Sequence, residues 1–162
     1  MNTTSPPPDS RVADESTESP SADPDPPEPC LTVSCDVDAD DAPGELYLRD
    51  HLLRAIDQLD ADVASLNLVV IDDSTMAQTH ERYSGMAGTT DVLTFDLRDE
   101  PTAPIDGEVY ACVDEARRRA AERGHAIEKE LLLYGLHGLL HLIGYDDHDE
   151  ADHKAMHAKE DE

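Results

Sequence analysis

Two histidines four residues apart are the residues of this sequence best placed to do chemistry. His137 and His141 lie in the segment 136–149, which reads LHGLLHLIGYDDHD. On a helix, residues i and i+4 share a face, so both imidazoles can reach the same metal ion. Gly144 follows three residues later and can end the helix, so that the chain returns toward that face. The pattern predicts a metal site built by one helix and the turn after it.

The third ligand of this site has two candidates. Asp147 stands six residues after His141, the usual spacing for this geometry, whereas His148 offers an imidazole, which suits zinc better than a carboxylate. Three protein ligands and an open fourth position are the arrangement of catalytic zinc. We therefore expect one Zn²⁺ ion bound by the two histidines and by either Asp147 or His148. The competing interpretation is that the two histidines are buried, hydrogen-bonded core residues.

Gly138, directly after the first histidine, argues against one class of zinc enzyme. The zinc peptidase motif H-E-x-x-H has a glutamate at this position, where it acts as the general base. Glycine has no side chain that could take this role. A metal here would instead activate water and polarise an acceptor oxygen, while other groups orient the substrate.

The segments around the histidines alternate between strand and helix patterns. Short β-branched runs predict strands, and apolar residues at helical spacing predict helices, two of them ended by Gly124 and Gly144. Ser74 is the expected N-cap of a further short helix. The predicted strands span 31–35, 66–71, 90–95 and 108–113, and the other predicted helices span 45–59, 114–123, 128–143 and 149–159. Four strands and about five helices in this order predict one α+β domain with a mixed sheet, with the metal site on a central helix and the following turn.

Residues 1–29 differ in composition from the rest of the chain. They hold eight of the eleven prolines and seven acidic residues, with one arginine and almost no aliphatic side chains. Such a segment buries too little apolar surface to offset the entropy lost when it becomes ordered. We expect a disordered, acidic, proline-rich tail over 1–29 and a single domain over 30–162.

The charge of the chain excludes several kinds of partner. The 162 residues carry 12 basic and 38 acidic side chains, a formal net charge of −26, and residues 30–162 alone still carry −20. This argues against a broad basic face for nucleic acid and against an anionic membrane surface. With no tryptophan and one phenylalanine, the composition also argues against an aromatic stacking platform.

The compartment is predicted from apolar runs and cysteines. The longest uncharged apolar run, 131–143, is shorter than the roughly 18 residues that a membrane span needs, and the N-terminus lacks the pattern of a secretory signal. Three cysteines without metal-type pairing argue against a disulfide framework. We expect a cytoplasmic protein.

Several motifs together resemble one known family. They are TTDVLTFD (89–96), DGEVYACVDEA (106–116), HGLLHLIGYD (137–146) and Glu130 upstream of the histidines. In this order and at this spacing they resemble the YbeY endoribonucleases, which are bacterial rRNA maturation factors, over residues 30–160. The resemblance implies a metal-dependent, single-strand-specific RNA hydrolase that acts in 16S rRNA 3′-end processing and ribosome quality control. Its substrate would be single-stranded rRNA and its partners the ribosome or ribosomal proteins, with no role for DNA or a membrane.

The family's metal ligands are three histidines, with zinc the usual metal. His137 and His141 match the first two. The third falls on Asp147 in an ungapped alignment, and Met156, which matches a methionine nine residues after the third ligand, supports that register. His148 could take this role only if the turn is one residue longer.

The family's phosphate-binding arginine has no direct counterpart here. In the family it follows an aromatic residue, whereas here Ser84 follows Tyr83, and Thr89 stands where the family has a proline. Arg82 is the nearest substitute and is our candidate phosphate contact, against the alternative of a plain surface arginine on a helix.

Two further features each have two interpretations. The basic cluster 117–123 could contact an RNA backbone, or it could be a solvated helix face that balances nearby acids. Asp91 could orient a ligating imidazole, or it could cap a turn.

The sequence thus predicts a zinc-dependent, single-strand-specific endoribonuclease in rRNA maturation. One alternative is a non-catalytic ribosome-assembly factor with a structural metal site, which the acidic surface fits well. The other is a metallopeptidase, which Gly138 disfavours.

Overall fold

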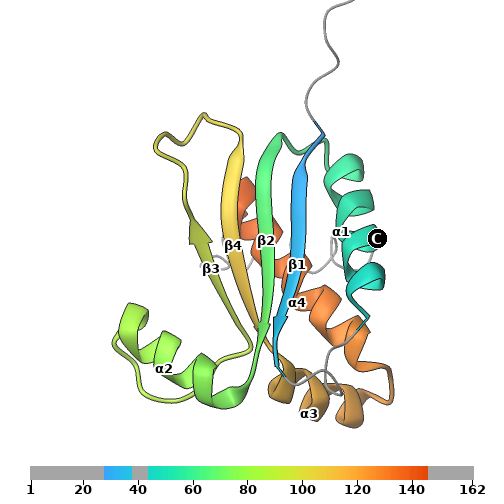
Figure 1. The fold of residues 1–162 in the computed structure, drawn as a ribbon, viewed down its shortest axis with the longest axis vertical. Coiled ribbons are helices and arrows are strands. Elements are labelled where there is room, and N and C mark those ends of the chain that lie inside the picture. Colours follow the sequence, from blue (N-terminus) through green and yellow to red (C-terminus); the bar gives the residue numbers. More distant parts are fainter. Residues whose placement is uncertain (1–27, 38–43, 146–162) are drawn as a thin grey trace, which may run out of the picture.

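A four-stranded sheet with helices packed against it makes up the described residues, 28–37 and 44–145 of the computed structural model (Figure 1). In Figure 1, α4 passes behind the sheet, α1 lies to the right of β1, and α2 and α3 lie at the lower end of the sheet. The elements in chain order are β1 (Cys30–Asp36), α1 (Glu45–Gln58), β2 (Val63–Ile71), α2 (Asp73–Ser84), β3 (Val92–Asp96), β4 (Ile105–Cys112), α3 (Val113–Arg123) and α4 (Ile127–Ile143). The predicted single α+β arrangement is confirmed for these residues.

The strand order β1-β2-β4-β3 makes β3 an edge strand of the described sheet. β1, β2 and β4 run parallel, with Leu66 of β2 opposite Gly107 of β4. β3 is antiparallel to β4 and places Thr94 opposite Val109. The sheet is therefore mixed, as predicted, and its one antiparallel strand lies at the border that faces the C-terminal half of α4.

The hydrophobic core lies between the sheet and the helices α1 and α4. Side chains alternate in burial along the strands, because successive residues point to opposite faces. Each fully buried leucine contributes about 1.5–3 kcal/mol relative to an exposed one. The core includes Leu31, Val33, Leu48, Leu52, Ile56, Leu66, Leu68, Val70, Val109, Leu131, Leu139 and Leu142.

Two glycines allow α4 to pack directly against the sheet. A Cβ atom on Gly138 would lie 2.5 Å from Val109 Cγ2 and 3.0 Å from Thr94 Oγ1. A Cβ atom on Gly107 would lie 2.6 Å from Leu142 Cδ1. Side chains at either position would push the helix away from the strands. Gly138 is thus a packing residue, which explains physically why the position of the peptidase glutamate is occupied by glycine.

The predicted element boundaries differ from the structure by up to three residues. β2 begins at Val63 instead of residue 66, and β3 begins at Val92 instead of residue 90. The prediction that Ser74 caps α2 is wrong. Asp72 is the N-cap, because its Oδ1 accepts a 2.7 Å hydrogen bond from the backbone N–H of Thr75.

The predicted helix ends at glycine are confirmed. Gly124 and Gly144 follow α3 and α4 with φ angles of 71° and 111°, a left-handed conformation that glycine adopts without strain. The described ranges contain four helices, against about five predicted, and the predicted helix 149–159 lies outside them. Most of the predicted tail 1–29 lies outside them as well.

Two observations concern the predicted compartment. Cys30, Cys35 and Cys112 are all free, which agrees with the prediction of no disulfide framework. Within residues 28–37 and 44–145, every helix is too short or too polar to cross a membrane.

Candidate functional site

His137 and His141 point their Nε2 atoms at each other from the C-terminal half of α4. The two atoms are 3.0 Å apart, so one ring donates a hydrogen bond to the other, and the rings stand nearly perpendicular at 82°. A tetrahedral zinc ion with Zn–N distances of about 2.0–2.1 Å would hold two nitrogens about 3.3 Å apart. The pair therefore fits a shared divalent ion after a movement of a few tenths of an ångström.

The histidine pair forms one wall of an open depression of about 500 Å³. The opposite wall is the edge strand β3 with the residue before it. The lining residues are Asp91, Val92, Leu93, Thr94, Asp96, His137, His141 and Leu142. We call this the histidine depression. These lining residues include two carboxylates, Asp91 and Asp96, and the hydroxyl of Thr94.

The predicted third ligand, Asp147 or His148, lies outside the described residues. Within residues 28–37 and 44–145, no three His, Cys, Asp or Glu side chains come together in a group that could hold a metal ion. The two histidines that sequence spacing paired are thus brought together, and the choice between Asp147 and His148 stays a prediction.

Asp91 takes part in a turn at the start of β3. Its Oδ1 accepts hydrogen bonds from Val92 N–H at 2.9 Å and from the Thr90 hydroxyl at 3.1 Å. Its backbone carbonyl accepts from Cys112 N–H at 2.9 Å. The capping interpretation of Asp91 is therefore observed. The same residue also lines the histidine depression, so a role in orienting an imidazole stays open.

Arg98 connects the end of β3 to the end of α4 and was missed by the sequence analysis. Its Nε and Nη2 bind both carboxylate oxygens of Asp96, at 2.8 and 2.6 Å, and Nη2 also donates to the Leu142 carbonyl at 2.9 Å. These hydrogen bonds lower the pKa of Asp96. Arg98 thereby holds the two walls of the histidine depression together, and it neutralises one of the carboxylates that line it.

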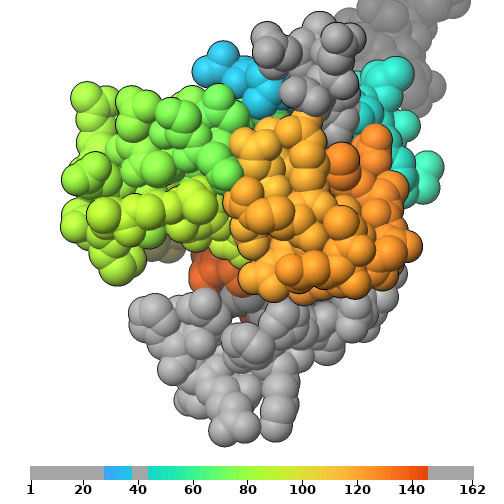
Figure 2. Space-filling view, turned by 90° about the horizontal axis from the view of Figure 1, so that it is seen from below, coloured from blue at the N-terminus to red at the C-terminus, as the bar shows by residue number. Residues whose placement is uncertain are grey.

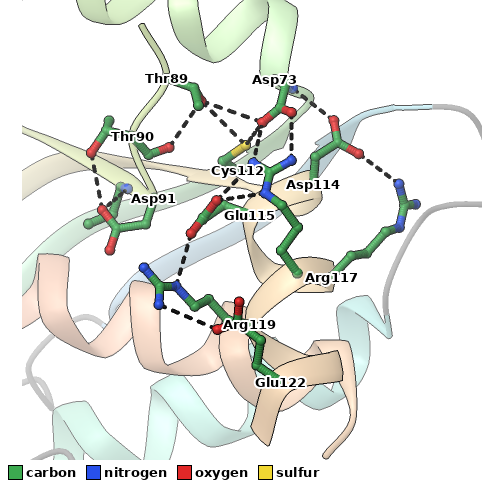
Figure 3. A network of polar contacts seen from close by, with 12 residues as sticks. Asp73, Thr89, Thr90, Asp91, Cys112, Asp114, Glu115, Arg117, Arg119 and Glu122 are labelled. Atoms are coloured by element: carbon green, nitrogen blue, oxygen red, sulfur yellow. Dashed lines mark hydrogen bonds and ion pairs between the residues drawn. The ribbon is translucent and has the colours of Figure 1, made fainter.

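A second polar network holds the segment that leads into β3, at the lower end of the sheet in Figure 1. Figure 2 looks at this end of the molecule and shows α2 (green) beside α3 (orange). Asp73, at the start of α2, accepts hydrogen bonds from Arg118 Nη1 and Nη2 at 2.8 and 2.9 Å and from Cys112 Sγ at 3.1 Å (Figure 3). The Thr89 hydroxyl, two residues before Asp91, donates to the same carboxylate at 3.5 Å.

The ionisation of this network follows from its contacts. The Arg118 guanidinium lowers the pKa of Asp73 to about 2, so the carboxylate is charged at neutral pH. Burial raises the pKa of the Cys112 thiol to about 11, so the thiol keeps its proton and donates it to Asp73. The network is therefore a fixed structural joint between α2, the segment leading into β3, and α3.

A family model described as "Endoribonuclease YbeY" matches residues 45–162 of this chain. The chain belongs to the YbeY family. The predicted resemblance is thereby confirmed over most of the sequence, including all of the histidine segment.

Individual relatives agree with the YbeY model. An Endoribonuclease YbeY from Frankia alni is 41% identical, with the match covering 56% of this chain and about half, 55%, of that protein. The Endoribonuclease YbeY of Salinibacter ruber is 36% identical over 71% of this chain and 78% of its own length. The solution structure of TM1509 from Thermotoga maritima matches with a TM-score of 0.58 and 27% identity, over 81% of this chain and 84% of that one.

The basic cluster on α3 is engaged in ion pairs with nearby acids. All four of its arginines have carboxylate partners within 3.0 Å, so the structure favours the interpretation of a balanced helix face over an RNA contact in this YbeY chain. The pairs are Arg117 with Asp114, Arg118 with Asp73 and Glu115, Arg119 with Glu115, and Arg123 with Glu130.

Glu130, one of the family-motif residues, is a fully buried anchor of α4. Its Oε1 pairs with Arg123 Nη1 at 2.8 Å and with His125 Nε2 at 2.9 Å. These contacts tie the first turn of α4 to the end of α3. Glu130 therefore supports the histidine helix from its other end, seven residues before His137.

Arg82 lies in a different depression from the histidines. It is exposed on α2 and lines a hollow with Tyr83, Phe95 and Tyr110, whereas the histidine depression contains neither Arg82 nor Ser84. β3 separates the two. The predicted phosphate contact by Arg82 stays a prediction, and any phosphate that it binds would lie on the other side of β3 from the histidine pair.

Proposed function

We propose that this member of the YbeY family is a metal-dependent, single-strand-specific endoribonuclease that acts in rRNA maturation, including 16S rRNA 3′-end processing, and in ribosome quality control. The observation that carries the proposal is the Nε2 pair of His137 and His141, 3.0 Å apart at the wall of an open depression. The names of the relatives supply the substrate class.

The metal we propose is one Zn²⁺ ion, held by the two histidines and by Asp147 or His148. Such an ion supplies Lewis-acid polarisation of a phosphoryl oxygen and activation of a water molecule. The ring nitrogens that meet at 3.0 Å are the donor atoms of the pair. Asp91, on the facing wall, is the candidate for orienting a ligand.

Arg98 has an electrostatic role in this proposal. An RNA phosphate that approaches the histidine pair meets the carboxylates of Asp91 and Asp96 in the lining. Because Arg98 neutralises Asp96 through two hydrogen bonds, it reduces the repulsion between this lining and the phosphate. The same arginine keeps β3 against α4, so the depression retains its width.

The cellular setting is part of the proposal. A substrate in the ribosome implies the cytoplasm, ribosomal proteins as partners, and no DNA or membrane partner. Three free cysteines are compatible with that reducing compartment.

The test is cleavage of a labelled single-stranded RNA by the full chain, with a duplex of the same sequence, single-stranded DNA and casein as parallel substrates. We expect cleavage of the single-stranded RNA alone. His137→Ala and His141→Ala should each lose metal, measured by mass spectrometry, together with cleavage. His51→Ala, on α1 and outside the histidine depression, is the matched control and should retain both.

The third ligand is tested by Asp147→Ala and His148→Ala separately. Loss of metal in only one of them identifies the ligand. Full cleavage by metal-free protein would contradict the proposed mechanism.

The second candidate function is a non-catalytic ribosome-assembly factor with a structural metal. The ion-paired arginines of α3 favour it, because they leave that helix without free positive charge for RNA. Retention of the metal without any RNA cleavage by the wild-type chain would support this alternative.

A further inference from the structure

The face of the sheet opposite α4 carries a second depression, of about 800 Å³, between α2 and the strands β3 and β4. Along β4, Gly107 and Val109 contact α4, so the alternating residues Glu108 and Tyr110 point to the other face. The lining residues are Thr75, Gln78, Thr79, Glu81, Arg82, Tyr83, Phe95, Leu97, Glu108 and Tyr110. We call this the aromatic groove.

Three aromatic rings meet in this groove. The ring centroids of Tyr83 and Phe95 are 4.8 Å apart, and those of Phe95 and Tyr110 are 5.5 Å apart, both with edge-on geometry. The chain has only six aromatic side chains, five Tyr and one Phe, so half of them gather here. The low number of aromatic residues argued against a stacking platform. Composition gives this number but not the positions of the rings in the fold.

One of the three rings, Tyr83, is open to solvent, and the other two are half-buried. Tyr83 is 64% exposed and Leu97 is 50% exposed, which makes them two of the most exposed large apolar side chains of the described residues. The hydroxyl of Tyr110 donates to Glu108 Oε2 at 3.1 Å, so this ring is held in place. An exposed ring that contacts half-buried rings at a depression is an arrangement found at binding surfaces.

The polar groups of the groove suit a nucleotide. Among the arginines of the described residues, 98, 117, 118, 119 and 123 make ion pairs, whereas 49, 54 and 82 make none with a described residue. Of these three, Arg82 lines the groove, together with the carboxylates of Glu81 and Glu108. Gln78 and Thr79, one turn earlier on α2, add an amide and a hydroxyl. The guanidinium of Arg82, beside rings in edge-on contact and hydrogen-bonding groups, can bind a phosphate while a base packs on an exposed ring.

The groove and the histidine depression lie on opposite faces of β3. Val92 and Thr94 line the histidine depression, and Phe95 and Leu97 line the groove. Because β3 is the edge strand of the described sheet, a ligand chain that crosses this edge touches both sites.

We propose that the aromatic groove binds bases of the same single-stranded RNA whose phosphodiester lies at the histidine pair. A base stacks on Tyr83 and Phe95, and Arg82 contacts a neighbouring phosphate. This inference rests on the proposed function. It favours RNA over an apolar peptide because the groove combines three rings with a guanidinium, an amide and a hydroxyl, beside the edge strand that also lines the histidine depression.

The experiment measures binding separately from cleavage. Full-length His137→Ala protein, which should not cleave, is titrated with a single-stranded RNA that carries 2-aminopurine at one position, moved along the oligonucleotide in successive preparations. Stacking on the rings should quench its fluorescence at a fixed distance from the bond that wild-type protein cuts. Tyr83→Ala should weaken binding by about tenfold or more and remove the quenching, since stacked bases depend on the ring.

Matched variants keep the test specific. Tyr83→Phe retains the ring and should bind within about twofold of the parent. Tyr47→Ala removes an exposed tyrosine from α1, outside the groove, and should have no effect. Arg82→Gln should weaken binding and flatten its salt dependence, because one phosphate contact is lost.

The outcomes separate the groove from the proposed function. If the wild type cleaves RNA and Tyr83→Ala shows unchanged binding and quenching, the proposal that the groove binds bases is overturned. The proposed nuclease activity is then still supported. If RNA binding depends on Tyr83 but the wild type does not cleave RNA, base binding in the groove is supported and the proposed nuclease activity is contradicted. If the wild type binds no RNA, or if Tyr83→Ala alters only self-association in light scattering, the RNA proposal is overturned in favour of a protein partner or a second copy.

Discussion

The two faces of β3 carry sites that are built in opposite ways. The histidine depression depends on close packing, since Gly138 brings the α4 backbone onto Val109 and Arg98 fastens the helix end to the strand. The aromatic groove consists of side chains that stand out into solvent, with Tyr83 64% exposed. A site for a metal ion needs ligand atoms fixed to tenths of an ångström, whereas bases of varied sequence can stack on rings that adapt. The comparison suggests that one face is made for chemistry and the other for holding substrate.

The largest expected effect is a loss of RNA cleavage without an equal loss of RNA binding. His137→Ala should reduce RNA cleavage more than about 100-fold, because removal of a ligand exceeds the 10–100-fold typical of groups that only support one. RNA binding, measured by fluorescence anisotropy, should stay near the wild-type value if the groove supplies most of it. An equal loss of RNA binding would mean that binding also requires the histidine site. The proposed division between a cleavage site and a separate binding groove would then be wrong.

The second prediction concerns the packing that only the histidine face requires. Gly138→Ala places a methyl group 2.5 Å from Val109 Cγ2 and should destabilise the fold by about 1–3 kcal/mol in urea denaturation. Metal affinity should fall as the helix moves, while binding of RNA to the groove changes less. The double variant Gly138→Ala, Val109→Ala should recover part of the lost stability, because the opposing side chain becomes smaller. Additive losses would show that the contact is not the cause.

The smallest expected effect is on the stability of the network around Asp73. This network holds the segment that leads into β3, the strand that both sites share. The pKa of Asp73 is about 2 in the folded chain, below its ordinary value of 3.8. A lowered folded pKa means that its contribution is complete well above pH 4 and is lost as pH falls toward 2. Because Asp73 is 41% exposed, we expect this contribution to be about 1 kcal/mol.

Asp73→Asn tests this value. The variant should be less stable than the wild type at pH 6, and the difference should shrink as pH falls from 5 to 2. Asp50→Asn, at an exposed position on α1, serves as the control and should show no such convergence. A constant difference between Asp73→Asn and the wild type over this range would assign the effect to packing instead of charge.

Sequence periodicity was sufficient to predict the histidine helix, but it could not predict which residues surround the histidines. The i, i+4 histidines and Gly144 are local features, and α4 together with its left-handed end followed from them. Arg98 escaped notice because its partners, Asp96 and the Leu142 carbonyl, include one that is 44 residues away. Ser74 was predicted as the cap because serine suits that role, but the hydrogen bond from Thr75 N–H to Asp72 Oδ1 shows that the helix begins at Asp73, with Asp72 as its cap.

The aromatic groove shows a different limit. Tyr83, Phe95 and Tyr110 come from three separate elements, and only the antiparallel pairing of β3 with β4 brings two of these rings together. Alternation along each strand indicates that its residues share a face, but not which neighbouring strand completes that face. A low aromatic content therefore does not predict where the aromatic side chains gather.

The direct contact between Gly138 and Val109 also bears on how fast and how tightly an ion could be captured. Since the α4 backbone rests on the strand, the helix can neither roll nor slide without opening the core, and the two imidazoles already face one another at 3.0 Å. If the pair binds an ion as proposed, the ion would meet two imidazoles that already face each other, so less entropy would be lost on binding than with two freely rotating side chains.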